Sequence, residues 1–189
     1  MNKYVLASSN KNKLKEIKEK LKKFDILSLD DIGFHSEIDE TGSTFHENSY
    51  IKSLTIFHHC GIDTISDDSG LIVSCLNGRP GVFSARYAGS ECNTDANIRK
   101  LLNELKDQND RQAKFKTVIC LKNKSDHFFF TGECHGKITR LPQGKNGFGY
   151  DSIFVPNGFD DTFAQMPFKL KNKISHRSKA IEKLVKFLI

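Results

Sequence analysis

Short apolar runs alternate along the chain with segments whose apolar residues recur at helical spacing, and this alternation constrains the fold more than any other feature. Residues 4–7 and 26–29 are apolar runs typical of buried strands, whereas residues 14–24 carry large apolar side chains three or four positions apart. The alternation continues, with strand-like runs at 64–66, 71–73, 115–121, 128–131 and 153–156 and helix-like segments at 44–60, 98–105 and from Ser175 onward. A polar turn at 123–126 joins two of the runs. The sequence therefore predicts an α/β fold with some antiparallel pairing.

The length of 189 residues suits a single domain that spans residues 1–189. Apolar residues make up 38% of the chain and charged residues 28%, values close to those of globular proteins. No segment has the polar, low-complexity composition of a disordered region, and no internal repeat is visible. We therefore expect the whole chain to fold as one unit.

Cysteine usage and the absence of long apolar segments bear on the compartment. The five cysteines are scattered and form no C-x-x-C pair, which suits a reducing cytosol and offers no zinc site. Residues 1–7 lack the basic leader and long apolar run of a secretory signal, and no stretch is apolar enough to span a bilayer. We expect a cytoplasmic protein with no membrane partner.

The net charge of +6 raises the alternative of a basic module that binds RNA or DNA. Such a module would gather its lysines and aromatic residues on one surface. The lysines here are dispersed, so we favour compositional drift as their explanation and expect no nucleic-acid partner.

A polar loop joins the first strand to the first helix, and its sequence is Ser8-Ser9-Asn10-Lys11-Asn12-Lys13. The N-terminus of a helix presents backbone N–H groups and a positive dipole end, so a phosphate can bind there, with Lys13 adding charge. The alternative is that serine and asparagine only cap the helix.

Two adjacent carboxylates, in Asp67-Asp68-Ser69-Gly70, lie between two short apolar runs, which predicts a strand break at this point. Neighbouring strand residues point to opposite faces, so one carboxylate should face a cleft while the other is structural. Carboxylate oxygens are ligands that magnesium prefers, and a carboxylate can also orient or deprotonate water. The alternative is an Asp-rich turn that caps backbone groups.

A further acidic group, Glu37, Asp39 and Glu40, precedes the second helix and has surface solvation as its default explanation. Glu47 is accounted for by a capping box with Thr44. Lys52 follows in the same helix and could share a phosphate with Lys13.

Glycines and an aromatic residue meet in Gly147-Phe148-Gly149-Tyr150-Asp151, where the backbone can approach a ligand and Phe148 offers a flat stacking face. Ser175-His176-Arg177, preceded by Lys171, supplies donors suited to a purine keto oxygen. Core packing and an ordinary helix start are the alternative explanations.

Taken together, these segments resemble the inosine triphosphate pyrophosphatase family over nearly the whole chain. The matching elements, in order, are Ser8-x-Asn10-x-x-Lys13, Thr41-Gly42-x-Thr44-Phe45-x-Glu47-Asn48, Lys52, Ser66-Asp67-Asp68-Ser69-Gly70-Leu71, Gly81-Val82-x-Ser84-Ala85-Arg86-Tyr87, Phe148-Gly149-Tyr150-Asp151 and Ser175-His176-Arg177. Each element is modest alone, but their joint order and spacing are highly specific.

The resemblance implies an elongated two-lobed α/β fold, with a central twisted mixed sheet flanked by helices and a nucleotide cleft between the lobes. It implies a Mg²⁺-dependent hydrolase that cuts noncanonical purine triphosphates (ITP, dITP, XTP) to the monophosphate and pyrophosphate, and usually a homodimer. Such an enzyme cleanses the nucleotide pool before aberrant bases enter DNA or RNA.

The same resemblance assigns roles by position. Asp68 matches the general base and metal ligand. The expected substrate contacts are Ser8, Ser9, Asn10, Lys11, Asn12, Lys13, Lys52, Ser69, Phe148, Gly149, Tyr150, Asp151, Lys171, His176 and Arg177. The second acidic metal ligand of the family corresponds to Asp39 or Glu40. The related Maf-like nucleotide pyrophosphatases share the polar loop after the first strand, but the Phe-Gly-Tyr-Asp and Ser-His-Arg elements argue against that group.

Overall fold

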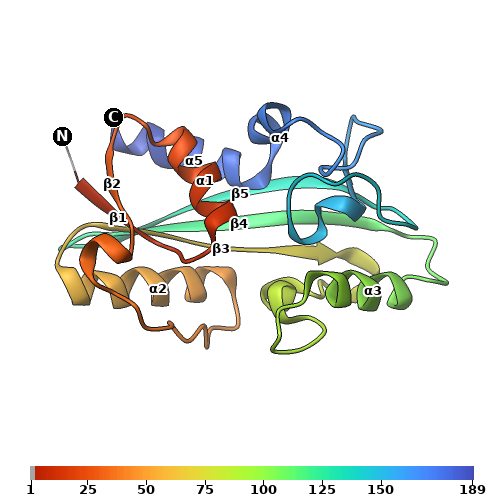
Figure 1. Cartoon of the computed structure of the whole chain (residues 1–189), viewed down its shortest axis with the longest axis horizontal. Helices are drawn as coiled ribbons and strands as arrows, with labels where there is room; N and C mark the ends of the chain where they lie inside the picture. Colours follow the sequence, from red (N-terminus) through yellow and green to blue (C-terminus); the bar gives the residue numbers. More distant parts are fainter. Residues whose placement is uncertain (1–2) are drawn as a thin grey trace. The chain divides into compact units, whose positions relative to one another are not determined.

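The computed structural model describes residues 3–189, so the part of the N-terminal prediction that falls on Met1 and Asn2 lies outside the described residues. Figure 1 shows the helices and strands. The strands are β1 (Lys3–Ala7), β2 (Asp25–Leu27), β3 (Thr64–Val73), β4 (Gln112–Lys122), β5 (His127–Ile138) and β6 (Phe154–Pro156). The α-helices are α1 (Lys11–Lys20), α2 (Phe45–Cys60), α3 (Thr94–Glu104), α4 (Phe168–Ile174) and α5 (His176–Leu188), with short 3₁₀ helices that include η3 (Gly81–Arg86) and η4 (Gly149–Ile153).

The strands form one mixed sheet in the order β2-β1-β3-β4-β5-β6. Strand β1 runs parallel to β2 and to β3, with Val5 opposite Thr64 in the second pair. Strand β6 is antiparallel to β5, with Gly136 opposite Pro156. Strands β4 and β5 are neighbours in the sheet and are joined by the turn at 123–126. Because parallel strands need a much longer connection, this pair is antiparallel. The predicted α/β class with partly antiparallel pairing is confirmed.

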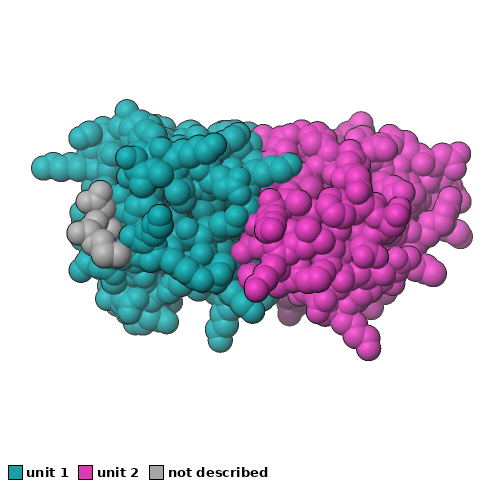
Figure 2. Space-filling view, turned by 90° about the horizontal axis from the view of Figure 1, so that it is seen from above, with its two compact units in different colours: residues 1–68, 117–132, 177–189 teal, residues 69–116, 133–176 magenta. Residues whose placement is uncertain are grey.

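The chain divides into two compact units, coloured separately in Figure 2. Unit 1 comprises residues 1–68, 117–132 and 177–189, and unit 2 comprises residues 69–116 and 133–176. Each unit is assembled from segments that are distant in sequence. The expectation of one domain spanning residues 1–189 stays a prediction.

In unit 1 the sheet is covered on both faces, by α1 and α5 on one and by α2 on the other (Figure 1). Strand alternation explains the split, because Tyr4 and Leu6 pack into the cluster with α1 and α5, whereas Val5 and Ala7 pack with Ile56 of α2. A strand buried on both faces reads as a continuous apolar run, as residues 4–7 do.

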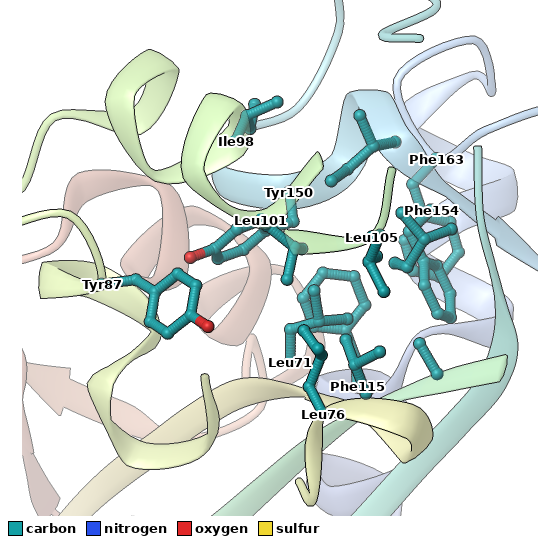
Figure 3. Close-up of a cluster of buried hydrophobic side chains, with 14 of the residues drawn as sticks. Leu71, Leu76, Tyr87, Ile98, Leu101, Leu105, Phe115, Tyr150, Phe154 and Phe163 are labelled. Carbon is teal, nitrogen blue, oxygen red and sulfur yellow. The ribbon is translucent and has the colours of Figure 1, made fainter. Parts of the chain in front are cut away.

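Unit 2 has its own apolar core, shown in Figure 3. Leu101 and Leu105 of α3 lie in it together with Leu71 of β3, Phe115 of β4 and Phe154 of β6. Helix α3 supplies the apolar face predicted from its spacing. Tyr150 of η4 is part of the same cluster.

Two predictions about local structure need correction. No strand break occurs at Asp67 and Asp68, because β3 continues from Thr64 to Val73. Both carboxylates are buried, with Asp67 1% and Asp68 5% exposed. Buried carboxylates persist within a strand when cations and hydrogen-bond donors accompany them. Helix α4 was not predicted, since its seven residues are too few for a clear apolar period.

Two predicted helix caps are confirmed. The side chain of Asn10 accepts hydrogen bonds from the N–H groups of residues 12 and 13 and so caps α1. Thr44 and Glu47 form the reciprocal capping box of α2. Of the helices within residues 3–189, none has the length and apolar character needed to cross a membrane.

Candidate active site

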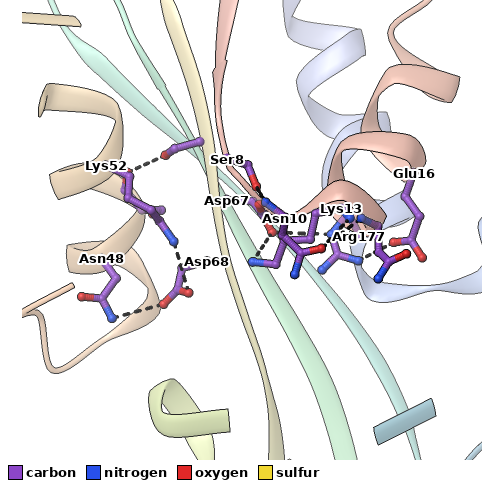
Figure 4. A network of polar contacts seen from close by, with 12 residues as sticks. Ser8, Asn10, Lys13, Glu16, Asn48, Lys52, Asp67, Asp68 and Arg177 are labelled. Atoms are coloured by element: carbon purple, nitrogen blue, oxygen red, sulfur yellow. Dashed lines mark hydrogen bonds and ion pairs between the residues drawn. The ribbon is translucent and has the colours of Figure 1, made fainter. Parts of the chain in front are cut away.

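Asp67 and Asp68 are neighbours in β3 and contact different helices, as Figure 4 shows. Asp68 contacts side chains of α2, and Asp67 contacts side chains of α1 and α5. The period of two in a strand produces this division. Ile65, two residues before Asp67, lies in the apolar cluster with α1 and α5, as the period requires.

Asp68 lies in a polar cluster with α2, and this cluster is the centre of the candidate site. Asn48 Nδ2 donates to Asp68 Oδ2 at 3.3 Å, and Lys52 Nζ lies 3.5 Å from Asp68 Oδ1. Because Asn48 and Lys52 are four residues apart in a helix, they occupy one face. Glu40, in the irregular segment before α2, adds a second carboxylate, with its Oε1 3.0 Å from Lys52 Nζ.

The charges in this cluster are unequal, with two carboxylates around one ammonium group. Burial raises the pKa of Asp68, and the negative charge of Glu40 raises it further, against the opposing effect of Lys52. Burial alone would lower the pKa of Lys52, but the charges of Asp68 and Glu40 outweigh it and raise that pKa. Lys52 therefore stays charged, while Asp68 is a better proton acceptor than an ordinary aspartate.

The structure distinguishes Glu40 from Asp39 as neighbours of Asp68. Glu40 is half-buried and shares Lys52 with Asp68, whereas Asp39 is solvent-exposed. Within residues 3–189 no group of three or more His, Cys, Asp or Glu side chains gathers to hold a metal ion. Magnesium is commonly bound by one or two carboxylates together with substrate phosphates, so the oxygens of Asp68 and Glu40 fit its chemistry.

Asp67 belongs to a second buried ionic cluster. Its Oδ2 lies 3.1 Å from Lys13 Nζ and 3.5 Å from Arg177 Nε. Arg177 also pairs with Glu16 of α1, and its side chain is only 2% exposed. These four charges balance within unit 1, which fits the structural role predicted for Asp67.

Lys13 and Lys52 lie against different carboxylates, Asp67 and Asp68 respectively. Burial lowers the pKa of Lys13, and the charge of Asp67 opposes that effect. The idea that both lysines share one phosphate stays a prediction.

The loop from Ser8 to Lys13 is ordered by its own hydrogen bonds. Asn10 Oδ1 accepts from the N–H groups of Asn12 and Lys13 at 3.0 and 3.2 Å, and Ser8 Oγ accepts from the N–H of Asn10. The helix-cap explanation for Asn10 is therefore confirmed, while phosphate binding by the loop stays a prediction. The side chains of this loop reach the surface at Ser9, Asn10, Lys11 and Asn12.

In unit 2 the expected base-binding residues form a compact group around Asp151. Its Oδ2 accepts from the N–H of Phe148 at 2.8 Å and from Lys171 Nζ at 2.7 Å. Lys171 Nζ also lies 4.7 Å from the centre of the Phe148 ring, within reach of a cation–π interaction. Gly147 has a φ of +76°, and a Cβ there would lie 2.1 Å from Asp151 Oδ2. The glycine therefore permits the close approach of this loop to the carboxylate.

The other residues of unit 2 that are expected to contact substrate include Tyr150, Gly149 and Ser69, and they lie in different surroundings. The Tyr150 hydroxyl donates to the carbonyl of Ser84 at 2.9 Å and is buried. Gly149 has a φ of +58°, and Ser69 is half-buried in β3 next to Asp68. Binding of substrate by these residues stays a prediction.

His176 is held by an aromatic partner that the sequence did not reveal. Its ring stacks on Phe115 of β4 with centroids 4.7 Å apart and an interplanar angle of 12°. The sequence predicts Phe115 only as part of a strand and Glu16 only as part of a helix. Asn48 had a usable signal, since it matches the family element and precedes Lys52 by four residues on one helical face.

Comparison with known proteins places these arrangements in a family. The model of the Ham1 family matches residues 4–187. A dITP/XTP pyrophosphatase of Christiangramia forsetii is 50% identical over 98% of both chains, and one of Flavobacterium johnsoniae is 46% identical over 98% of this chain and 97% of the relative. The Ham1 protein of Staphylococcus aureus superposes with a TM-score of 0.92 at 40% identity, covering 99% of this chain and 98% of that one. The HAM1 protein of Coxiella burnetii gives a TM-score of 0.93 at 40% identity, covering 100% and 98%. With the family model spanning almost its full length and relatives this similar, the chain belongs to the Ham1 family.

Proposed function

We propose that this protein hydrolyses noncanonical purine nucleoside triphosphates such as ITP, dITP and XTP to the monophosphate and pyrophosphate. The observation that carries the proposal is the buried cluster in which Asp68 meets Asn48 and Lys52, with Glu40 on the same ammonium. The names of the relatives, dITP/XTP pyrophosphatase, support the substrate class.

Asp68 is the proposed general base. Its raised pKa makes it more basic than an ordinary aspartate, so it can orient a water molecule and accept its proton. Asn48, which donates to Oδ2, holds the carboxylate in one orientation. Lys52 keeps its charge and is proposed to stabilise negative charge that develops on the phosphates.

We propose that Mg²⁺ is bound by Asp68 together with Glu40, and that Glu40 rather than Asp39 is the second acidic ligand. When bound, the ion neutralises phosphate charge and polarises the bond that breaks. Lys52 is close to both carboxylates, so its ammonium group occupies a position of strong negative potential. The ammonium group of Lys52 is the proposed source of positive charge for a phosphate bound beside these carboxylates.

The phosphate chain is assigned to the N-terminus of α1 and Lys13 in unit 1. The helix dipole favours an anion at this end, and Asn10 fixes the first turn. Lys13 is paired with the buried Asp67, which holds its ammonium group in place.

The base is assigned to Phe148, Lys171 and His176 in unit 2. The half-buried ring of Phe148 offers a stacking surface. Donors from His176 and Arg177 would meet the 6-keto oxygen of hypoxanthine or xanthine, whereas adenine presents an amino group there. Arg177 is already engaged by Asp67 and Glu16, so we propose that it also acts by fixing the start of α5.

We further propose that the enzyme acts as a homodimer in the cytoplasm, where it cleanses the nucleotide pool. No disulfide joins the five cysteines of the described chain, which is compatible with a reducing compartment. The alternative of a basic module that binds RNA or DNA predicts affinity that falls steeply with salt.

A panel assay tests the proposal. Purified protein is incubated with ITP, dITP, XTP, GTP and ATP, with and without Mg²⁺, and pyrophosphate is measured separately from phosphate. We expect pyrophosphate from ITP, dITP and XTP far faster than from ATP, and only with the metal. Equal turnover of ITP and ATP would contradict the proposal, because an unpaired buried donor costs roughly 1–3 kcal/mol.

A further inference from the structure

Tyr150 lies in the middle of the proposed base-binding loop, but its side chain is part of the unit 2 core. It is only 5% exposed and packs in the apolar cluster drawn in Figure 3. Its hydroxyl donates to the main-chain carbonyl of Ser84 at 2.9 Å. Burial raises the pKa of Tyr150, so the hydroxyl remains a donor throughout the physiological pH range.

The carbonyl that receives this bond is itself firmly held. The Oγ of Ser84 accepts from the N–H of Leu71 in β3 at 2.9 Å. On its C-terminal side, Asn97 of α3 accepts from the N–H of Ala88 at 2.6 Å and donates to the carbonyl of Ala85 at 2.8 Å. The acceptor is therefore fixed by both a strand and a helix of unit 2.

The orientation of the Phe148 ring depends on the backbone of this loop. Asp151 fixes the loop through the N–H of Phe148, and Tyr150 fixes it through Ser84. Glycines stand at 147 and 149, so the intervening backbone has wide conformational freedom unless its neighbours hold it.

We propose that Tyr150 is a positioning residue that fixes the stacking face of Phe148 through its hydrogen bond to Ser84, and that it makes no contact with substrate. This inference rests on the proposed function for its kinetic consequence. It replaces the sequence-based expectation that Tyr150 binds the substrate directly.

Tyr150→Phe is the direct test, because it removes only the hydroxyl. Tyr87→Phe is a matched control: that hydroxyl donates to Glu104 at 2.6 Å, and the ring lies in the same apolar cluster. We expect Tyr150→Phe to raise the KM for ITP about 3- to 10-fold with little change in kcat, since stacking holds ground and transition states alike. Both variants should lower Tm to a similar extent, but Tyr87→Phe should leave KM unchanged. Unchanged KM in Tyr150→Phe, or an equal rise in Tyr87→Phe, would overturn the proposal.

A second measurement works without turnover. The chain has no tryptophan, so Phe148→Trp places a single tryptophan at the stacking position, and its emission can be excited selectively over that of the tyrosines. Adding Tyr150→Phe should shift its emission to the red and increase its quenching by acrylamide, whereas adding Tyr87→Phe should do neither. Identical spectra and quenching in all three backgrounds would refute the anchoring role, even if the protein proved inactive toward ITP. Inactivity of the wild-type protein alone would refute only the proposed function.

Discussion

Asp68→Asn removes one of the two carboxylates that share the ammonium group of Lys52, and it should sharply reduce activity without harming the fold. Loss of a general base typically reduces kcat by about 10²–10⁴-fold, which corresponds to roughly 3–5 kcal/mol in the barrier. Stability should respond differently. The cluster carries two negative charges and one positive charge, so neutralising Asp68 leaves Lys52 balanced by Glu40 at 3.0 Å.

The sign of the stability change follows from the pKa of Asp68. Because that pKa is raised in the folded protein, ionisation of Asp68 weakens folding, and a neutral asparagine avoids this cost. The Tm of Asp68→Asn should therefore equal or exceed that of the wild type. The difference should be fully present above the raised pKa and should shrink as the pH falls toward the ordinary value for aspartate, below which the wild-type carboxyl is protonated in both the folded and the unfolded state.

Asp67→Asn is the control and should behave in the opposite way. It removes the carboxylate that pairs with both Lys13 and the buried Arg177, and breaking a buried ion pair costs about 3–5 kcal/mol. For a chain of this length, that corresponds to a Tm lower by about 6–20 °C. We would measure ITP turnover across a Mg²⁺ titration together with Tm for both variants. A folded Asp68→Asn enzyme with near wild-type activity, or a larger loss of Tm in Asp68→Asn than in Asp67→Asn, would refute this reasoning.

Three further predictions address stacking of the nucleobase, the pH dependence of activity and the reactivity of the thiols. Phe148→Ala should raise the KM for ITP more than it lowers kcat, because stacking on one aromatic ring is worth roughly 1–3 kcal/mol in both states; an unchanged KM would make Phe148 a packing residue. Since the base form of Asp68 is lost at a higher pH than that of an ordinary aspartate, the acid limb of a pH profile of kcat/KM should lie above the usual range for aspartate; a limb at the ordinary position would contradict the burial argument. Native protein treated with iodoacetamide should be alkylated at the exposed Cys92, whereas Cys120 should resist, because it is buried and burial raises its pKa to about 11. Mass spectrometry of peptides measures the order, and faster alkylation of Cys120 would contradict this prediction.

The sequence predicted the α/β class and the helix starts because these depend on local periodicity and capping. It also predicted that Asp67 and Asp68 face opposite ways, since a period of two is a property of any strand. The strand break was wrong because the charges that make these carboxylates tolerable come from elsewhere: Arg177 lies 110 positions from Asp67. Periodicity carries no information about such long-range partners.

The irregular segment before α2 shows the same limit. Sequence reasoning left Asp39 and Glu40 open, because no regular structure fixes which side chain turns inward there. The geometry separates them through Lys52, which Glu40 approaches to 3.0 Å. Phe115 also looked like ordinary strand core, since nothing local indicates that it stacks on His176.

The continuity of β3 through Asp67 and Asp68 has a consequence for insertions and deletions. Removing or adding one residue earlier in the strand would shift its register by one and exchange the faces to which the two carboxylates point. Both aspartates would still be present, but Asp68 would no longer face Lys52. Length changes in β3 should therefore be rejected even where individual substitutions are tolerated, whereas the exposed segment at 89–92 should accept them.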